Sequence, residues 1–474
     1  MTVAIWFRSD LRVQDNPALH AACSSREPVL AFYFFTPEQF TEHDMGLTRQ
    51  RFIIGNLLSL SQDLQKIGVP LLAERCDRFD DSVKKLLTLC LQYGVTQLHF
   101  NEEYELNERR RDTLAFSLLT SAGIGVQRHQ DQTLLAPGSV MTGQGSPFRV
   151  FTPFKRVWIQ LARRDAVQPL PTPKKRQAPD VTATAAEKIE RWVKPQAANA
   201  FWKAGSKEAC RRLDQFVELR IERYQEQRDF PALDGTSQLS PYLAVGALSP
   251  RACLHAALSA NRFEWDSGNP GIQTWISELI WREFYKHLIF NFPELCKGRA
   301  FQPATEFVRW QRNPELLDAW KNGTTGYPIV DAAMRQLSTL GWMHNRLRMV
   351  TAMFLTKHLF IHWKEGERWF MQQLIDGDFA ANNGGWQWSA STGADAAPYF
   401  RVFNPTRQSE RFDADGTFIR HWLPELNTLG GKQIHDPTPL ERQLCSYPHP
   451  IVDHRVAVDR IKQEFQSLKT VALA

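Results

Sequence analysis

Acidic side chains set between tryptophans are the most distinctive candidates for chemistry in this sequence. In the helical pattern Ile272–Phe290, positions 275, 278 and 282 share one face, and position 281 lies beside it. These positions carry Trp275, Glu278, Arg282 and Trp281. A carboxyl group flanked by indoles suits a partly apolar cleft, where it can hold a proton and hydrogen-bond a nucleobase edge. A surface ion pair between the glutamate and the arginine four residues later fits equally well.

A second group combines arginine, asparagine and methionine in an otherwise apolar stretch. Asn345, Arg348 and Met349 fall at helical spacing of three and four residues. A buried or half-buried arginine needs an anion. Asp376 and Asp378 are the nearby candidates.

The run from Asp376 to Trp388 contains two carboxylates, three amides, a glycine pair and two indoles. Two acids separated by one glycine could indicate a calcium loop, but the other oxygen ligands of such a loop are missing, so we predict no metal site. Carboxylates can accept from ribose or ring N–H groups, amides can face ring edges, and glycines allow close backbone approach. This set favours a heterocyclic ligand.

Hydroxyl side chains follow Gly235 in the segment that ends at Pro241. Ser240, directly before the proline, is typical of a helix cap. Backbone N–H groups and hydroxyls at a helix start also form a ready phosphate site. Both interpretations fit the segment.

The first 130 residues predict a doubly wound α/β domain, with a parallel sheet covered on both faces. Short apolar runs alternate there with helical patterns that end at glycines. The expected strands are Val3–Phe7, Val29–Phe35, Pro70–Glu74 and Gln97–Asn101, and the expected helices include Arg51–Ile67 and Asp80–Tyr93. Phosphate-binding glycine motifs are absent, so we do not expect a dinucleotide or nucleoside-triphosphate site of the common types. If this domain binds a ligand, we expect it in the crevice at the carboxyl ends of the strands.

Residues 131–200 predict an interdomain linker, because prolines and lysines crowd the stretch from Pro137 to Pro195 and leave no pattern for a packed element. Residues 201–474 predict a larger all-α domain. Its expected helices include Glu208–Tyr224, Ile272–Phe290, Pro328–Leu340, His344–Leu359 and Glu365–Ile375.

Composition sets wider limits on function. The chain has 474 residues and a net charge of +6, which permits a polyanionic partner without requiring one. Its seven cysteines show no Cys-x-x-Cys spacing, which favours reduced thiols in a cytoplasmic protein. The sequence shows no signal-peptide pattern and no apolar run of membrane-spanning length, so we expect no membrane association.

Taken in order, these stretches resemble DNA photolyases along nearly the whole chain, above all the bacterial photolyases that repair cyclobutane pyrimidine dimers. One such motif would be weak, but the ordered series is specific. The matching segments are Trp6–Arg12, Asn107–Arg109, Trp281–Tyr285, Gly341–Arg346, Asp376–Trp388 and Tyr399–Pro405.

The resemblance implies a non-covalent FAD in the helical domain, active in its reduced form. Light-excited reduced flavin in this family gives an electron to the dimer, which splits and returns it. The resemblance places Asn382 near the flavin N5 and pairs Arg348 with Asp376 beside the ring. The implied FAD contacts are Tyr224, Thr236, Ser237, Leu239, Ser240, Trp275, Arg282, Arg348, Asp376, Asp378 and Asn382.

By the same resemblance, damaged DNA is the partner, and the dimer is flipped out of the duplex into a pocket. Glu278, Trp281, Asn345, Met349 and Trp388 would line that pocket. Phosphate contacts would come from Arg228, Arg346 and Arg401 and would give a salt-sensitive affinity. An electron relay would run from flavin to surface through Trp386, Trp363 and Trp310.

An antenna cofactor is also implied for the α/β domain. Asn107, Glu108, Cys296 and Lys297 match positions that hold methenyltetrahydrofolate in relatives, although other photolyases use a deazaflavin or no antenna.

Other functions remain to be weighed. A cryptochrome-type photoreceptor is the chief alternative, because it shares the fold and the flavin. Single-strand-specific cryptochromes usually have tyrosine at the position of Trp388, and (6-4) photolyases use a histidine at the position of Met349. A flavin oxidoreductase is disfavoured by the missing dinucleotide motif. We expect a monomer without an obligate protein partner.

Overall fold

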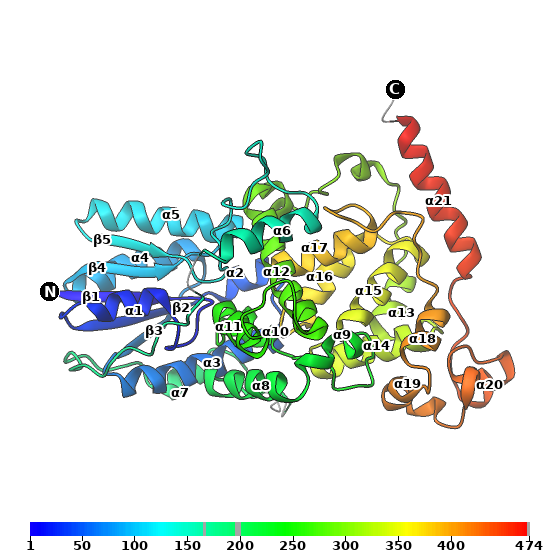
Figure 1. Cartoon of the computed structure of the whole chain (residues 1–474), viewed down its shortest axis with the longest axis horizontal. Helices are drawn as coiled ribbons and strands as arrows, with labels where there is room; N and C mark the ends of the chain where they lie inside the picture. Colours follow the sequence, from blue (N-terminus) through cyan, green and yellow to red (C-terminus); the bar gives the residue numbers. More distant parts are fainter. Residues whose placement is uncertain (165–166, 195–200, 472–474) are drawn as a thin grey trace. The chain divides into compact units, whose positions relative to one another are not determined.

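The computed structural model describes residues 1–164, 167–194 and 201–471 (Figure 1). By packing, the chain divides into two compact units that do not follow the three predicted segments. The first unit comprises residues 1–225, 237–293 and 375–378, and the second comprises residues 226–236, 294–374 and 379–474.

The first unit contains the predicted parallel sheet, whose strands run in the order β3-β2-β1-β4-β5. All four neighbouring pairs are parallel. The doubly wound α/β prediction is therefore confirmed, and a fifth strand that was not predicted extends one edge. The strands are β1 (Thr2–Phe7), β2 (Val29–Phe35), β3 (Leu71–Arg75), β4 (Val95–Asn101) and β5 (Gly125–His129).

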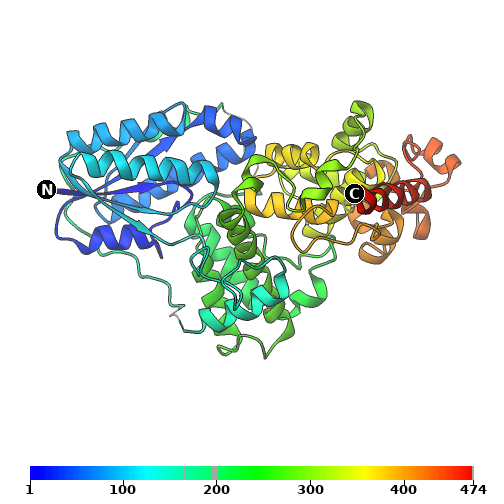
Figure 2. The ribbon, with the colours of Figure 1, turned by 90° about the horizontal axis from the view of Figure 1, so that it is seen from above.

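Helices cover both faces of this sheet (Figure 2). On one face, Trp6 and Phe32 pack against Leu86 of α4 (Phe79–Gln92) and Leu119 of α5 (Leu106–Ser121). Helix α1 (Pro17–Ser24) contacts β1 and β4. Side chains alternate between the two faces along each strand, and because helices cover both faces, nearly every residue of β1 and β2 is buried. The other helices of this unit are α2 (Pro37–Glu42), α3 (Leu47–Lys66), α6 (Phe151–Ala162), α7 (Ala186–Glu190), α8 (Ser206–Leu219), η1 (Ile221–Arg223), α10 (Ser240–Ala244), α11 (Pro250–Ala260) and α12 (Pro270–Asn291), and α9 (Tyr224–Gln227) crosses the boundary between the units.

Helix α6 contradicts the prediction that residues 137–195 contain no packed element. Its Phe151, Phe154 and Trp158 are buried at helical spacing, and the Trp158 indole N–H donates to Glu283 Oε2 at 2.6 Å. Pro153 lies in the first turn, where a helix tolerates proline because the first N–H groups have no partner within the helix. Because prolines are frequent in the surrounding sequence, this short amphipathic helix was not predicted.

The second unit is helical around a core that includes Trp320, Trp363 and Trp386. The predicted helix Pro328–Leu340 is observed with these ends as α14, whereas the predicted helix His344–Leu359 is α-helical only to Met353 and continues as the single π-helical turn η4 (Phe354–His358). The remaining elements are η2 (Pro293–Lys297), η3 (Pro303–Phe307), α13 (Pro314–Asn322), α15 (Asn345–Met353), α16 (Trp363–Gln373), α17 (Phe379–Ala390), α18 (Pro405–Phe412), α19 (Thr417–Trp422), η5 (Pro424–Leu426), η6 (Gly431–Ile434), α20 (Pro439–Leu444) and α21 (His454–Val471). No described helix is both long and apolar enough to cross a membrane.

Candidate active site

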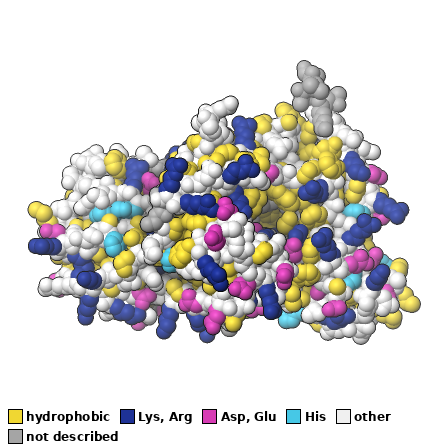
Figure 3. Space-filling view, viewed as in Figure 1, with side chains coloured by type: hydrophobic (Ala, Val, Ile, Leu, Met, Phe, Trp, Pro, Cys, Tyr) yellow, Lys and Arg dark blue, Asp and Glu magenta, His cyan; other side chains and the backbone are white. Residues whose placement is uncertain are grey.

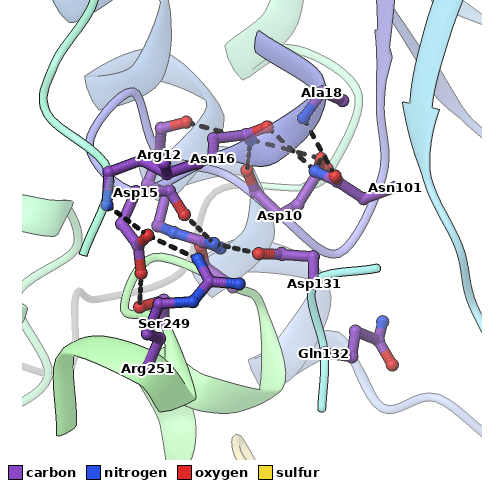
Figure 4. A network of polar contacts seen from close by, with 12 residues as sticks. Asp10, Arg12, Asp15, Asn16, Ala18, Asn101, Asp131, Gln132, Ser249 and Arg251 are labelled. Atoms are coloured by element: carbon purple, nitrogen blue, oxygen red, sulfur yellow. Dashed lines mark hydrogen bonds and ion pairs between the residues drawn. The ribbon is translucent and has the colours of Figure 1, made fainter. Parts of the chain in front are cut away.

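The strand order reverses between β1 and β4, and parallel α/β sheets commonly bind ligands at such a point. Here buried polar side chains occupy that edge. Asn101 Nδ2 donates to Asp10 Oδ2 at 2.6 Å and to Asn16 Oδ1 at 2.9 Å (Figure 4). Beside them, Arg12 pairs with Asp131. At this edge, buried polar side chains of the protein therefore pair with one another.

The antenna candidates of the first unit lie close by, in the first turn of α5. Asn107 Nδ2 lies 3.0 Å from His43 Nε2, and His43 Nδ1 lies 3.5 Å from Glu108 Oε1. Burial, together with the negative charges of Glu105 and Glu103, raises the pKa of Glu108 above its ordinary value. The three side chains form one polar cluster. The sequence analysis missed His43, because nothing in its local pattern points to a residue 64 positions away.

Cys296 and Lys297, the other two antenna candidates, stand in η2. The Lys297 amine pairs with Glu294 Oε1 at 2.5 Å, and its side chain is about half exposed. Both residues belong to the compact unit other than that of Asn107. That Cys296 and Lys297 hold one antenna cofactor together with Asn107 and Glu108 stays a prediction.

Helix α12 brings two of the FAD candidates together. The Phe216 ring lies 5.2 Å from Trp275 and 5.8 Å from Tyr224, centroid to centroid. A Cβ on Gly271 would lie 2.2 Å from the Glu222 carbonyl oxygen, so a glycine is needed where α12 approaches η1. Trp275 and Tyr224 therefore pack on the same ring, Phe216.

Asp376, one of the two predicted carboxylates, accepts a hydrogen bond from a residue of the first unit. Ser240 Oγ donates to Asp376 Oδ2 at 2.6 Å. Helix α10 begins at Ser240 itself, which moves the N-cap position to Leu239, so the helix-cap interpretation of Ser240 is wrong. Ser237, also a predicted contact, precedes this turn.

A buried lysine that the sequence analysis missed neutralises Asp378. The Lys286 amine lies 2.8 Å from Asp378 Oδ2 and 2.8 Å from Glu105 Oε1, and its side chain is 3% exposed. Its position four residues after Arg282 placed it on the same face of α12, which was the available signal. Arg282 itself donates to the Gln132 carbonyl oxygen at 2.5 Å.

The substrate-side candidates of the first unit also stand on α12. Glu278 and Trp281 are both half-buried. The Trp281 ring stacks nearly parallel on Phe151 of α6, with centroids 3.6 Å apart and planes at 9°. Next to them, the Lys155 amine donates to Ser277 Oγ at 2.6 Å. Helix α6 thus covers one face of the indole that was expected to meet the lesion.

In the second unit, arginines gather around a buried imidazole. Arg346 Nη2 lies 2.7 Å from Asp229 Oδ2. Burial, together with the positive charges of Arg346, Arg348 and Arg228, lowers the pKa of His344 to about 4, although the negative charge of Asp229 acts to raise it. Two of the three predicted phosphate contacts, Arg228 and Arg346, therefore lie near one another.

The side chains of α17 that have different predicted roles point to different sides of the helix. Asn382 and Trp386 are four residues apart and share a face, whereas Trp388, two residues on, points to nearly the opposite side. Asn382 Nδ2 donates to the Glu367 carbonyl oxygen at 3.0 Å, which leaves its amide oxygen as the acceptor it can offer. Helix α15, which carries Asn345 and Met349, packs against α17.

The predicted relay tryptophans are arranged around α16. Trp386 packs so tightly on this helix that a Cβ on Gly366 would lie 2.0 Å from its Cη2 atom. Trp363 stands one turn before that glycine. The His362 ring lies 5.6 Å from both Trp363 and Trp310, so it links them. Trp386 and Trp363 are buried and Trp310 is half-buried, as a path toward the surface requires.

The predicted site residues are divided between the two units, so pairs such as Arg348 and Asp376 stay predictions; within its own unit, Arg348 Nε donates to the Met343 carbonyl oxygen at 2.8 Å. Among the described residues, no group of three or more His, Cys, Asp or Glu side chains is placed to hold a metal ion. The first unit carries Asn107, Glu108, Tyr224, Ser237, Leu239, Ser240, Trp275, Glu278, Trp281, Arg282, Asp376 and Asp378. The second carries Arg228, Thr236, Cys296, Lys297, Trp310, Asn345, Arg346, Arg348, Met349, Trp363, Asn382, Trp386, Trp388 and Arg401.

A parallel α/β part, a helical part and a donor set of carboxylates, amides, hydroxyls and indoles define a class of protein that binds a large heterocyclic cofactor. Two family models match the chain. "DNA photolyase" covers residues 3–174, and "FAD binding domain of DNA photolyase" covers residues 275–467. The chain belongs to the DNA photolyase family.

Known proteins agree along the full length. The chain is 47% identical over 460 residues to the deoxyribodipyrimidine photo-lyase of Escherichia coli, covering 96% of each protein. A bacterial class III photolyase from Agrobacterium tumefaciens superposes with a TM-score of 0.89 at 35% identity, covering 99% of this chain and 98% of that one. A Synechocystis cryptochrome reaches a TM-score of 0.86 at 28% identity, covering 98% of each chain. The fold alone therefore does not separate repair from light sensing.

Proposed function

We propose that this protein repairs cyclobutane pyrimidine dimers in DNA in a reaction driven by light and dependent on reduced FAD. The observation that carries the proposal is the pairing of a half-buried carboxyl, Glu278, with the half-buried indole of Trp281 one turn later on α12. The 47% identity to a deoxyribodipyrimidine photo-lyase supports it.

The chemistry that bound FAD supplies is donation of an electron to the dimer after light absorption, and its recovery once the ring has opened. The protein's part is to hold and orient. Asp376, held by Ser240, and Arg282 offer an acceptor and a donor for the cofactor's polar groups, and Trp275 and Tyr224, which both pack on Phe216, offer apolar surface. The amide oxygen of Asn382 would accept from an N–H of the reduced ring. We propose the same role of cofactor contact for Thr236, Ser237, Leu239, Arg348 and Asp378.

On the substrate side, Glu278 would hold a proton at its carboxyl and hydrogen-bond the flipped bases. Trp281 and Trp388 would stack on them, with Asn345 and Met349 completing the wall. Phe151 covers one face of Trp281, and the Phe284 and Tyr285 rings each lie 5.6 Å from the indole, so the lesion would meet the part of the ring that these three leave exposed.

Affinity for DNA would come from a few placed cations. Lys and Arg side chains are spread over the visible face and do not gather in one patch (Figure 3). Arg228 and Arg346, which share the surroundings of His344, and Arg401 are the proposed phosphate contacts. Binding should weaken steeply with salt and be indifferent to sequence outside the dimer.

We further propose that Trp386, Trp363 and Trp310 carry an electron to a light-excited oxidised cofactor, and that a small reductant in solution re-reduces the outermost indole. Each indole can be oxidised transiently, and His362 bridges the outer two rings. For an antenna we propose a methenyltetrahydrofolate held by Asn107 and Glu108, to which His43 adds a third contact, with Cys296 and Lys297. An absorption spectrum of protein from its own source with flavin bands alone would contradict the folate.

In the cell, we propose a cytoplasmic monomer whose one macromolecular partner is damaged DNA. Residues 1–130 would serve as the antenna domain, residues 131–200 as the connection and residues 201–474 as the FAD- and DNA-binding part. Gel filtration with and without a dimer-containing duplex tests the monomer.

A cryptochrome-type photoreceptor is the second candidate, favoured by the 0.86 TM-score to a cryptochrome. The residues distinguish the two. Trp388 stands where single-strand-specific cryptochromes usually have tyrosine, and Met349 cannot titrate as the histidine of a (6-4) photolyase does.

The substitution Glu278→Ala tests the proposed substrate side. It should lower the number of dimers repaired per absorbed photon while the protein keeps its FAD, because Glu278 faces the bases in this proposal. FAD content and repair yield are measured on the same preparation. Loss of FAD with an unchanged yield per bound flavin would make Glu278 a structural residue and would count against the site.

A further inference from the structure

An exposed turn in the second unit belongs to no helix or strand. In the turn Pro398–Arg401, the Arg401 N–H donates to the Pro398 carbonyl oxygen at 2.9 Å. Phe400 at its tip is 61% exposed, and Arg401 is also exposed. An exposed aromatic ring can stack on a nucleobase, and an exposed arginine beside it can neutralise a phosphate.

A buried lysine holds this turn from below. Lys357 lies in the π-helical turn η4, and its side chain is fully buried. Its amine donates to the Arg401 carbonyl oxygen at 3.0 Å and to the Pro398 carbonyl oxygen at 3.4 Å. The two carbonyls are those at either end of the turn. Single π-helical turns are rare and occur often at functional sites.

The burial of this amine is unfavourable on its own. Burial, together with the positive charge of Arg401, lowers the pKa of Lys357 to about 7. Within the described part of the chain, no carboxylate pairs with it. The other titratable groups near it are His358 of the same turn, and His454 and Arg460 of α21, which contact His358. None of these stabilises a positive charge.

We propose that Lys357 is a positioning residue that fixes the turn Pro398–Arg401, so that the Arg401 guanidinium and the Phe400 ring meet DNA in one orientation. This inference rests on the proposed function, since it needs Arg401 to contact DNA. Tyr399 shares the task by stacking on Phe465 of α21, with centroids 5.5 Å apart and planes at 7°. The lysine acts through the turn and touches neither DNA nor cofactor.

A double-mutant cycle on the holoprotein tests the proposal. The variants are Lys357→Met, which keeps the length and removes the charge and the donors, Arg401→Gln, and the two together. Affinity for a duplex containing one dimer is measured across a range of salt concentrations. We expect Lys357→Met to weaken binding about threefold to tenfold and to flatten the salt dependence toward that of Arg401→Gln, which should lose about one phosphate contact. In the Arg401→Gln background, Lys357→Met should add little.

Two readouts separate positioning from general damage. Repair per photon at saturating DNA should stay at the parent level in Lys357→Met, because the lysine affects binding and not the bound complex. Lys432→Met, at an exposed lysine of the same unit, should change neither affinity nor salt slope by more than a general charge effect. If Lys357→Met does not accumulate with FAD, Lys357→Gln, which still offers an amide donor, is used for the same cycle and should lose less affinity than Arg401→Gln.

The outcomes distinguish this inference from the proposed function. Parent affinity in the lysine variant, or a full additional loss in the Arg401→Gln background, overturns the positioning role while Arg401 remains a DNA contact. Parent affinity in Arg401→Gln removes Arg401 from the DNA interface and overturns the inference with it. Absence of light-driven repair in the parent protein contradicts the proposed function itself.

Discussion

The contact between Gly366 and Trp386 allows a prediction in which two opposed effects can be weighed. A Cβ at position 366 would lie 2.0 Å from Cη2 and 2.4 Å from Cζ3 of the indole, whereas carbon atoms normally pack about 3.5–4.0 Å apart. Gly366→Ala must therefore displace the ring by about 1.5 Å. Overpacking of this kind typically costs about 1–3 kcal/mol. Alanine in a helix interior regains about 1 kcal/mol over glycine.

The overpacking cost wins, so Gly366→Ala should lower the free energy of unfolding by up to about 2 kcal/mol in urea. Light-driven reduction of oxidised flavin should slow, because Trp386 begins the proposed relay, while repair by pre-reduced protein continues. In a Trp386→Phe background the smaller ring removes the clash, and the same alanine should become neutral or stabilising. A stabilising Gly366→Ala in the parent chain would refute the packing argument.

Three further predictions follow from other contacts. Trp310→Phe should leave dimer repair by pre-reduced protein intact and slow the photoreduction of flavin, and reduction at the parent rate would remove Trp310 from the relay. Phe151→Leu keeps an apolar side chain but removes the parallel stack on Trp281, worth about 0.5–1.5 kcal/mol; dimer affinity should fall at most about two- to tenfold at unchanged FAD content, as measured by titration with a dimer-containing duplex. The free energy of unfolding is measured for the parent and for Lys357→Met at pH 7 and at pH 9. The value of the parent minus that of the variant should be about 2 kcal/mol larger at pH 9 than at pH 7. The sign follows because the folded-state pKa of Lys357 is lowered to about 7 and the unfolded chain keeps the ordinary 10.5, so the unfolded chain binds more protons in this window. A constant difference in urea midpoint over this pH range would show that the amine is not destabilised.

Strongly periodic segments could be predicted closely from the sequence. The strand Val29–Phe35 and the helix Pro328–Leu340 have the expected ends, because each is a continuous run of one pattern bounded by residues that stop it. The strand Gly125–His129 was missed. It is a short edge strand whose residues are mostly exposed, so burial imposes no alternation on it.

The side chains that hold the predicted site residues in place could not be predicted from local sequence patterns. His43 and Phe151 contact predicted residues that lie 64 and 130 positions away in the chain. Lys286 also contacts a predicted residue, but it stands on a helix face that it shares with many other side chains. Gly366 looks like an ordinary helix position until the Trp386 ring is seen against it. A single sequence shows which side chains could do chemistry and conceals which side chains hold them.

The central claim is tested most directly by light-dependent repair. Purified protein with its FAD pre-reduced is mixed with duplex DNA containing a single cyclobutane pyrimidine dimer, and one half is irradiated with blue or near-ultraviolet light while the other stays dark. We expect restored pyrimidines in the irradiated half and none in the dark half. Equal repair in darkness, or no repair under light with bound FAD verified, would contradict the central claim.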